Sequence, residues 1–222
     1  MFTLYTFGDS ILDCAHYNAE RVDPAGLLLN NRDDLFPEFR GRDLWTRLNG
    51  QARAERWARD GSTVDDLPVE DVLALSPEGP ALVLMTIGGN DLLRGLVDDT
   101  GPGIPEFARK LTAFLDALPI RPVVLGTVYD PTFGDDHAFD EVFSFDPPVA
   151  RANFDRMNAA LRDLAPKYGV LTDIHAHFLT GRPDWFVNVI EPSLRGASEV
   201  RRCLLDAIER VGWPDHRPGD RA

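Results

Sequence analysis

Apolar residues fall into short runs along this chain, and segments with helical spacing lie between them. Five runs rich in β-branched residues have the length of buried strands, namely residues 2–7, 52–58, 81–87, 122–128 and 169–174. Helices are expected over residues 43–48, 64–75, 104–118, 148–167 and 193–211. This alternation predicts an α/β fold in which helices cover both faces of one parallel sheet.

The clearest helical pattern lies between the fourth and fifth strands. Phe154, Met157, Leu161 and Leu164 recur at intervals of three and four residues, which is typical of a helix with one face packed on the core. Residues 17–40 and 129–147 have no such pattern, and no element is predicted there. Long loops near strand ends often carry function.

The composition is that of one globular domain spanning residues 1–222. Of the 222 residues, 44% are hydrophobic and 27% charged, and no run approaches the roughly 18 apolar residues of a membrane span. No basic segment precedes the first strand, so no secretory signal is expected. These features predict a soluble protein with a cytoplasmic location.

The charge narrows the range of partners. A net charge of −13 disfavours nucleic acid and anionic membrane, and the chain has no run of Lys and Arg that would neutralise phosphates. The two cysteines, Cys14 and Cys203, lie far apart without metal-ligand spacing, so free thiols are expected. We expect no cofactor and no metal; the oligomeric state is not predicted.

Small and polar residues follow every predicted strand. They are Gly8-Asp9-Ser10, Asp60-Gly61-Ser62, Gly88-Gly89-Asn90-Asp91, Tyr129-Asp130-Pro131 and Asp173-Ile174-His175. In an open parallel sheet, ligands bind beyond the carboxyl ends of the strands. The sequence therefore predicts a site at this edge of the sheet.

Three of these segments suit acyl transfer, which needs a nucleophile and hydrogen-bond donors for the developing oxyanion. Ser10, at a tight turn after the first strand, is the candidate nucleophile, and its backbone N–H is a candidate donor. Gly61 lets the backbone approach a substrate closely. Asn90 follows two glycines and offers a side-chain amide. Turn and helix-capping roles are the structural alternatives for all three.

These residues resemble the SGNH or GDSL esterases and lipases. Gly8-Asp9-Ser10, Gly61 and Gly88-Gly89-Asn90-Asp91 are similar to the first three sequence blocks of that family, in the same order and over nearly the whole chain. The resemblance implies a flavodoxin-like three-layer α/β/α fold with a five-stranded parallel sheet. It also implies that Ser10 is the nucleophile and that Gly61 and Asn90 complete the oxyanion hole.

The fourth block departs from the family, which has Asp-x-x-His shortly before its last helix. The corresponding positions here are Asn188 and Glu191. A carboxylate with an ordinary pKa of about 4.3 is a weak base at neutral pH unless burial or a nearby charge raises that pKa. Asn188 avoids the like-charge pair that an aspartate would form with Glu191. Glu191 could also simply stabilise the start of the last helix.

Two histidines are alternative bases. His175 and His177 leave the carboxyl end of the fifth strand, and histidine has a pKa better suited to the task. His-x-His also occurs at metal sites, but two ligands alone are weak evidence. Asp9 and Asp13 are candidate orienting groups for whichever base acts, and Asp130 is a further candidate with an equally plausible turn role.

The leading hypothesis is hydrolysis of a small or medium carboxylic ester through an acyl intermediate on Ser10, with a small-molecule ester as partner. A catalytically impaired binding protein that keeps the oxyanion donors is the second hypothesis. Acyl transfer to an alcohol is the third, and it uses the same acyl-serine step, so the sequence does not separate it from hydrolysis.

Overall fold

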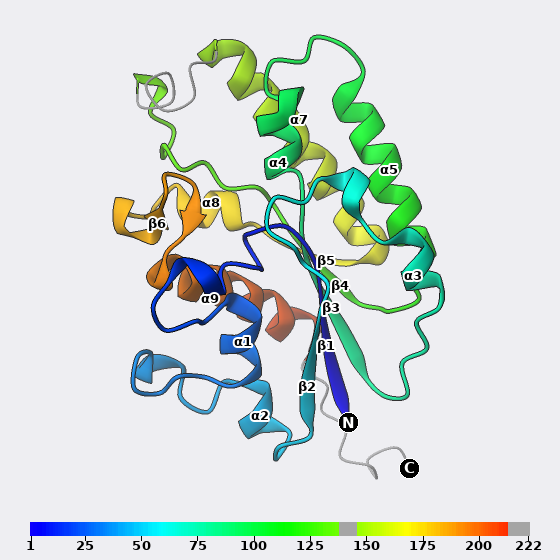
Figure 1. Cartoon of the computed structure of the whole chain (residues 1–222), viewed down its shortest axis with the longest axis vertical. Coiled ribbons are helices and arrows are strands. Elements are labelled where there is room, and N and C mark those ends of the chain that lie inside the picture. The colour runs from blue at the N-terminus through cyan, green and yellow to red at the C-terminus, as the bar shows by residue number, and fades with distance from the viewer. Residues whose placement is uncertain (138–145, 213–222) are drawn as a thin grey trace.

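The central layer is one parallel sheet of five strands in the order β2-β1-β3-β4-β5 (Figure 1). The computed structural model describes residues 1–137 and 146–212. The strands are β1 (Phe2–Gly8), β2 (Ala52–Arg56), β3 (Ala81–Thr86), β4 (Val123–Gly126) and β5 (Gly169–Thr172). The five predicted strands are confirmed, and so is the three-layer α/β fold.

Helices form the two outer layers (Figure 1). One layer holds α1 (Pro24–Leu29), α2 (Leu44–Arg47) and α9 (Leu194–Val211); the other holds α3 (Val69–Leu73), α5 (Gly103–Ala117) and α7 (Pro147–Tyr168). The side chains of β1 alternate between the two faces of the sheet, so this strand contributes to both apolar cores. Leu4 belongs to the core under α9, and Phe7 belongs to the core under α5 and α7. A strand buried on both faces is expected to be largely apolar, and in β1 only two threonines, Thr3 and Thr6, interrupt the aromatic and aliphatic residues between Phe2 and Phe7.

Short elements connect these layers. They are the helices η1 (Ala15–Tyr17), η2 (Pro37–Phe39), η3 (Val64–Asp66), α4 (Gly89–Asp91), η4 (Leu92–Leu96), α8 (Ile174–Phe178) and η5 (Pro183–Trp185), and a hairpin of β6 (Phe186–Val187) and β7 (Glu191–Pro192). The unassigned segment 17–40 contains α1 and η2. Of the second unassigned segment, 129–147, residues 138–145 lie outside the described residues.

The single helix predicted over residues 64–75 is wrong. The chain forms η3 and α3 instead, with Leu67 in an extended conformation between them. Pro68 explains the break, because proline has no N–H to donate and disfavours the helical conformation of the residue before it. The other predicted helices are present, and Ser193 caps α9 by accepting a hydrogen bond from the Gly196 N–H.

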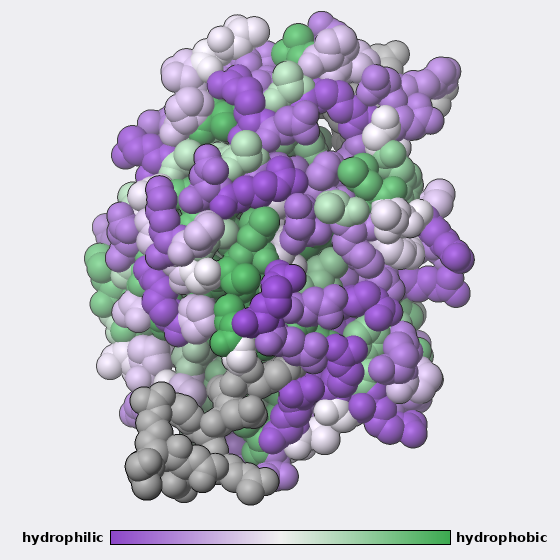
Figure 2. All heavy atoms as spheres, turned by 180° about the vertical axis from the view of Figure 1, so that it is seen from behind, coloured by the Kyte–Doolittle hydropathy of each residue, from purple (hydrophilic) through white to green (hydrophobic). Residues whose placement is uncertain are grey.

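The surface fits the acidic composition. The face shown in Figure 2 is mostly hydrophilic, and its apolar areas are interrupted by polar side chains. Within residues 1–137 and 146–212, no helix combines the length and the apolar character needed to cross a membrane. Cys14 and Cys203 are both buried free thiols.

Candidate active site

The strand order places the ends of β1 and β3 where ligands bind in this kind of sheet. The chain leaves β1 for β2 on one side and then returns to β3 on the other side, so the connections diverge between β1 and β3. Such a topological switch point opens a crevice at the carboxyl edge. Ser10 follows β1 and Asn90 follows β3, so both border this crevice.

The turn that carries Ser10 is held tightly against β3. Gly8 has a φ of 117°, and a side chain there would stand 1.6 Å from the Thr86 carbonyl oxygen. The Asp9 Oδ1 atom accepts hydrogen bonds from the Ile11 N–H at 3.2 Å and from the Thr86 hydroxyl at 2.7 Å. Ser10 itself is only 8% exposed. The nucleophile candidate is thus positioned by backbone geometry and by its buried neighbour Asp9.

Burial raises the pKa values of two carboxyl groups near this turn. Desolvation raises the pKa of Asp9 to about 6, against the lowering effect of its hydrogen bonds from Thr86 and Ile11. Desolvation likewise raises the pKa of Asp91 to about 6, although its carboxylate accepts from the Val64 N–H. Acidic groups with raised pKa values are common at functional sites.

Two of the three predicted oxyanion donors, Asn90 and Gly61, form hydrogen bonds with neighbouring residues. The Asn90 Nδ2 atom donates to the Ser62 carbonyl at 3.0 Å, which leaves its second amide hydrogen for a ligand. Gly61 has a φ of 77°, and its carbonyl accepts from Arg94 at 2.8 Å. Within the described chain, neither the Ser10 nor the Gly61 backbone N–H has an acceptor. Both therefore remain available as donors.

Glu191, on the β6–β7 hairpin, lies near the candidate nucleophile. Ser10 is close enough to lower the pKa of its carboxyl, and the residue is 9% exposed. The second carboxylate oxygen, Oε2, is buried and has no partner among the described residues. A buried oxygen without a donor is costly, so this carboxylate is poorly satisfied by the fold alone.

The turn before Glu191 is strained. Asn188 and Val189 have φ values of 47° and 75°, and the Ile190 N–H donates to the Asn188 carbonyl at 2.9 Å. This is the γ-turn with positive φ, the rare form, and it is centred on a β-branched residue. The Tyr129 hydroxyl donates to the Ile190 carbonyl and holds the turn over the site. Strained backbone of this kind concentrates at functional sites.

The electrostatic environment favours Glu191 as a base. Burial raises the pKa of the Glu191 carboxyl, the hydrogen bond from Ser10 lowers it, the charge of Asp60 raises it again and His16 lowers it; the net change is upward. A carboxylate whose pKa is higher binds a proton more strongly near neutral pH. The raised pKa therefore makes Glu191 a stronger base than an ordinary glutamate.

His16 lies beside this carboxylate and was not among the predicted site residues. Its Nε2 atom is 3.1 Å from the Asp60 carboxylate, which also accepts from the Tyr17 hydroxyl at 2.6 Å. Asp13, predicted as an orienting group, instead accepts from the Asp60 N–H at 3.0 Å. A signal was present, because His16 follows β1 and Asp60 follows β2 at the same sheet edge.

The two histidines predicted as alternative bases point elsewhere. The His177 Nε2 atom is 2.8 Å from Glu199 on α9, and its ring stacks on Trp185. The His175 ring packs beside Phe154, and its Nδ1 atom is buried without a described partner, which accompanies a pKa lowered by desolvation. No hydrogen bond in the described residues joins either histidine to Ser10.

Asp130 is likewise placed in a structural network. It is buried, pairs with Arg151 and accepts hydrogen bonds from Thr132 and Gly134. In the part of the chain that the structure describes, no group of three or more His, Cys, Asp and Glu side chains is arranged to hold a metal ion.

A cavity opens beside Ser10 and Asn90. The empty space between its walls is about 610 Å³, which includes space open to solvent, and Asp9 lines it next to Ser10. Its other walls are mainly apolar and come from the segments after β1, β3 and β4, from α7 and from the hairpin: Ile11, Leu92, Leu93, Val97, Val128, Tyr129, Pro131, Phe154 and Ile190. The nucleophile candidate thus lies at the edge of an apolar chamber.

Known structures share this architecture. The esterase EstA from Pseudoalteromonas sp. is 18% identical, with a TM-score of 0.59 over 94% of this chain and 97% of its own. The acetylxylan esterase Axe2 from Geobacillus stearothermophilus is 20% identical, with a TM-score of 0.64 over 95% and 94%. A member of the lipolytic G-D-S-L family from Veillonella parvula is 16% identical, with a TM-score of 0.58 over 95% and 100%. At these identities the likeness concerns the fold.

The sequence itself carries the family assignment. No protein with a curated description matches it. The model of the GDSL-like Lipase/Acylhydrolase family matches residues 6–196, a span that includes Ser10, Gly61, Asn90 and Glu191. The chain therefore belongs to the GDSL-like lipase/acylhydrolase family.

Proposed function

We propose that this protein hydrolyses small or medium carboxylic esters through an acyl intermediate on Ser10, with Glu191 as the base. Membership of a lipase and acylhydrolase family supports ester hydrolysis in general. The observation that carries the specific proposal is that the Ser10 side chain is close enough to the buried Glu191 carboxyl to lower its pKa. A nucleophile paired with a proton acceptor is the arrangement that acyl transfer requires.

The reaction proceeds in two halves. As the Ser10 oxygen attacks the ester carbonyl, its proton passes to Glu191, and the resulting carboxylic acid then protonates the departing alcohol. In the second half Glu191 takes a proton from water, the hydroxide attacks the acyl group, and Ser10 leaves with that proton. The negative charge on the carbonyl oxygen is stabilised by the Ser10 and Gly61 N–H groups and the Asn90 amide.

The apolar cavity supports an ester with an apolar acyl chain. Side chains such as Val97, Val128 and Phe154 offer no hydrogen bonds to a sugar ring but would cover a chain of several methylene groups. Each methylene removed from water contributes about 0.8 kcal/mol to binding. Butyrate and hexanoate esters are therefore better probes than acetate.

The test is covalent labelling. We expect a fluorophosphonate at pH 8 to modify the protein stoichiometrically, with the adduct located on Ser10 by mass spectrometry. Ser10→Ala is expected to abolish both labelling and hydrolysis of p-nitrophenyl butyrate. The matched control is Ser62→Ala, whose carbonyl rather than hydroxyl bonds Asn90 and which should still be labelled.

Two other outcomes would replace the proposal. A folded protein that is not labelled, yet is stabilised by a carboxylate ligand, would be a binding protein that has lost catalysis. A labelled protein that passes its acyl group to an added alcohol faster than to water would be an acyltransferase. Both use the same cavity and oxyanion donors, so the partition between water and alcohol has to be measured directly.

A further inference from the structure

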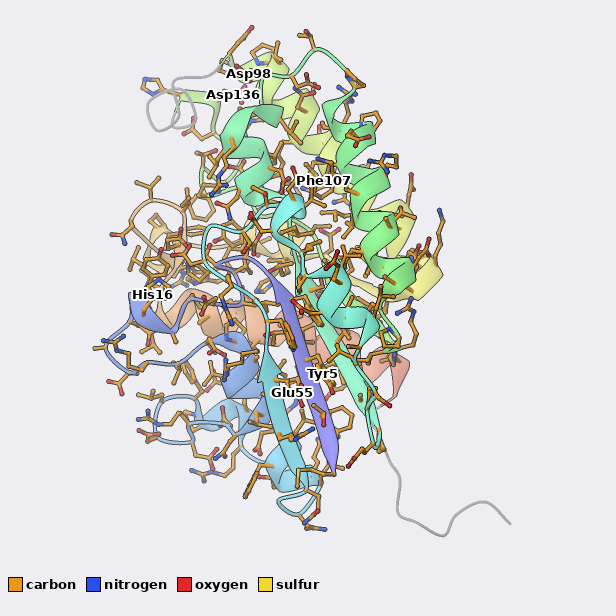
Figure 3. The ribbon with its side chains drawn as sticks, turned by 45° about the vertical axis from the view of Figure 1, so that its right-hand side comes forward. Tyr5, His16, Glu55, Asp98, Phe107 and Asp136 are labelled. Atoms are coloured by element: carbon orange, nitrogen blue, oxygen red, sulfur yellow. The ribbon has the colours of Figure 1, made fainter. Side chains whose placement is uncertain are left out.

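Two of the proposed oxyanion donors follow strands that are not neighbours in the sheet. Gly61 follows β2 and Asn90 follows β3, and β1 lies between these strands (Figure 3). In that view the labelled Glu55 marks β2 and the labelled Tyr5 marks β1. The hydrogen bonds of the sheet therefore do not link the two donors directly. Their spacing has to be set by contacts between the loop after β2 and the helical segment after β3.

Three side chains of α4 and η4 form such contacts. Each bonds to one backbone group of the loop: Asn90 donates to the Ser62 carbonyl, Asp91 accepts from the Val64 N–H, and Arg94 donates to the Gly61 carbonyl, at 3.0, 3.1 and 2.8 Å in that order. The loop is thus fastened to the helical segment along residues 61–64. Arg94 is the exposed member of the three, so it can be replaced without opening the core.

Arg94 holds the part of the loop that most needs an anchor. Gly61 has a φ of 77°, and a glycine backbone changes conformation at little cost. Its N–H has no acceptor in the described chain, and within the same residues its carbonyl has no donor besides Arg94. A side chain at residue 61 would stand 3.7 Å from the Arg94 guanidinium, so this group packs against the glycine as well as bonding to it.

We propose that Arg94 is a positioning residue that holds the Gly61 N–H in register with the Asn90 amide, so that both donors reach the same oxyanion. This inference rests on the proposed function. Oxyanion donors act because they are held in place before the charge develops, and loss of one donor typically costs about 10²–10³ in kcat. A loosened donor is only partly lost, so removal of the Arg94 guanidinium is expected to lower kcat about tenfold.

Kinetics with p-nitrophenyl butyrate test this role. In Arg94→Gln we expect kcat to fall about tenfold with KM little changed, because the contact serves the transition state and not the binding of the ester. Arg94→Lys keeps an N–H donor on a long side chain and should recover most of the lost kcat. The matched control is Arg59→Gln. This exposed arginine belongs to the same loop, but its guanidinium donates to the carbonyls of Arg56 and Ala58, so kcat should be unchanged.

Two kinetic outcomes would overturn the proposal. An equal loss of kcat in Arg59→Gln would mean that the positive charge of the loop matters and the contact with Gly61 does not. A raised KM with normal kcat in Arg94→Gln would mean that Arg94 binds the ester and does not position a donor.

A second measurement does not depend on turnover. The N–H order parameter of Gly61 reports how firmly this donor is held, since values near about 0.85 are typical of rigid backbone and values below about 0.6 of flexible backbone. Relaxation dispersion covers slower exchange. We expect a rigid Gly61 N–H in the wild type and in Arg59→Gln, and a mobile one in Arg94→Gln. That result supports the positioning role even in a protein that proves to be inactive, in which case only the proposed function fails. A Gly61 N–H that is equally rigid on both timescales in Arg94→Gln would overturn the role of Arg94.

Discussion

Two regions of the same sheet edge have histidine next to carboxylates. They differ in whether each carboxylate has a close hydrogen-bond donor or an oppositely charged partner. The β1 side consists of Ser10, His16, Asp60 and Glu191. The β5 side consists of the charged residues around α8, chiefly Asp173, His175 and His177, with their partners. Both lie after strands of one parallel sheet, so the strand pattern alone gives them equal standing.

On the β5 side the charges have close partners. Asp173 pairs with Arg162 at 3.2 Å, and His177 pairs with Glu199 at 2.8 Å. Burial by itself would raise the pKa of Glu199, but hydrogen bonds from His177 and Arg202 outweigh it and lower the pKa to about 2. A carboxylate that is so well matched holds the fold together and is a poor proton acceptor.

On the β1 side the matching is incomplete. Glu191 has one oxygen without a donor, and its pKa is raised mainly by burial. A carboxyl group that lacks donors or opposite charges and lies next to a nucleophile can accept a proton. A carboxylate that is held by such partners is a poor proton acceptor. The comparison therefore supports the proposal that Glu191 is the base, because its carboxyl lacks the close charged partners that Glu199 has.

The largest effect is expected when one glutamate on each side is neutralised. Glu191→Gln keeps the shape of the side chain but cannot accept the Ser10 proton, so kcat/KM is expected to fall about 10²–10⁴-fold. Glu199→Gln removes a matched carboxylate and should leave kcat/KM within a few-fold while lowering the free energy of unfolding at pH 7. Steady-state kinetics and urea unfolding of both variants give the two measurements.

The opposite pattern would reassign the base. If Glu199→Gln abolished activity and Glu191→Gln did not, catalysis would run through His177, whose hydrogen bond to Glu199 would then orient it. If both variants retained activity, the proton of Ser10 would pass to a group outside both regions.

Much of this site could be predicted because each of its main residues stands shortly after a strand that the sequence pattern already indicates. Ser10, Gly61 and Asn90 each follow a strand, and parallel strands bring their carboxyl ends to one edge whatever the loops do. His16 was missed because it lies inside the loop after β1 and not directly at the strand end, and no pattern marks its contact with Asp60, 44 residues away. The strained turn at Val189 was also invisible, since nothing in a β-branched residue signals a positive φ.

A second comparison concerns two aspartates, the buried Asp9 and the half-buried Asp173. Because the pKa of Asp9 is raised to about 6, its contribution to stability is full below the unfolded pKa near 4 and is lost as the pH rises through 6. Asp9→Asn keeps the acceptor oxygen for Thr86 and Ile11. It should therefore raise the free energy of unfolding at pH 8 by on the order of 2 kcal/mol and have little effect near pH 4.

Asp173 on the β5 side is the matched control. Burial would raise its pKa, but hydrogen bonds from Ala176 and Thr127 and the charge of Arg162 lower it on balance. Its stabilising contribution is therefore present above the unfolded pKa and is lost as the pH falls, so Asp173→Asn should destabilise the protein at pH 8. Urea unfolding at pH 4 and pH 8 would contradict this account if the two variants changed stability with the same sign.

The smallest predicted effect concerns how each side holds its residues. On the β5 side His175 belongs to the regular helix α8, whereas Glu191 follows the strained turn at Val189. Val189 is 55% exposed, so Val189→Gly gives up little burial and relieves the positive φ; after the entropy cost of glycine we expect a net gain in unfolding free energy of about 1 kcal/mol. The looser turn should lower kcat a few-fold.

The control variant is Val189→Asn. Asparagine also tolerates positive φ but keeps a side chain, so this variant should gain stability and retain kcat. Equal losses of kcat in both variants would show that the valine side chain, and not the stiffness of the turn, positions Glu191.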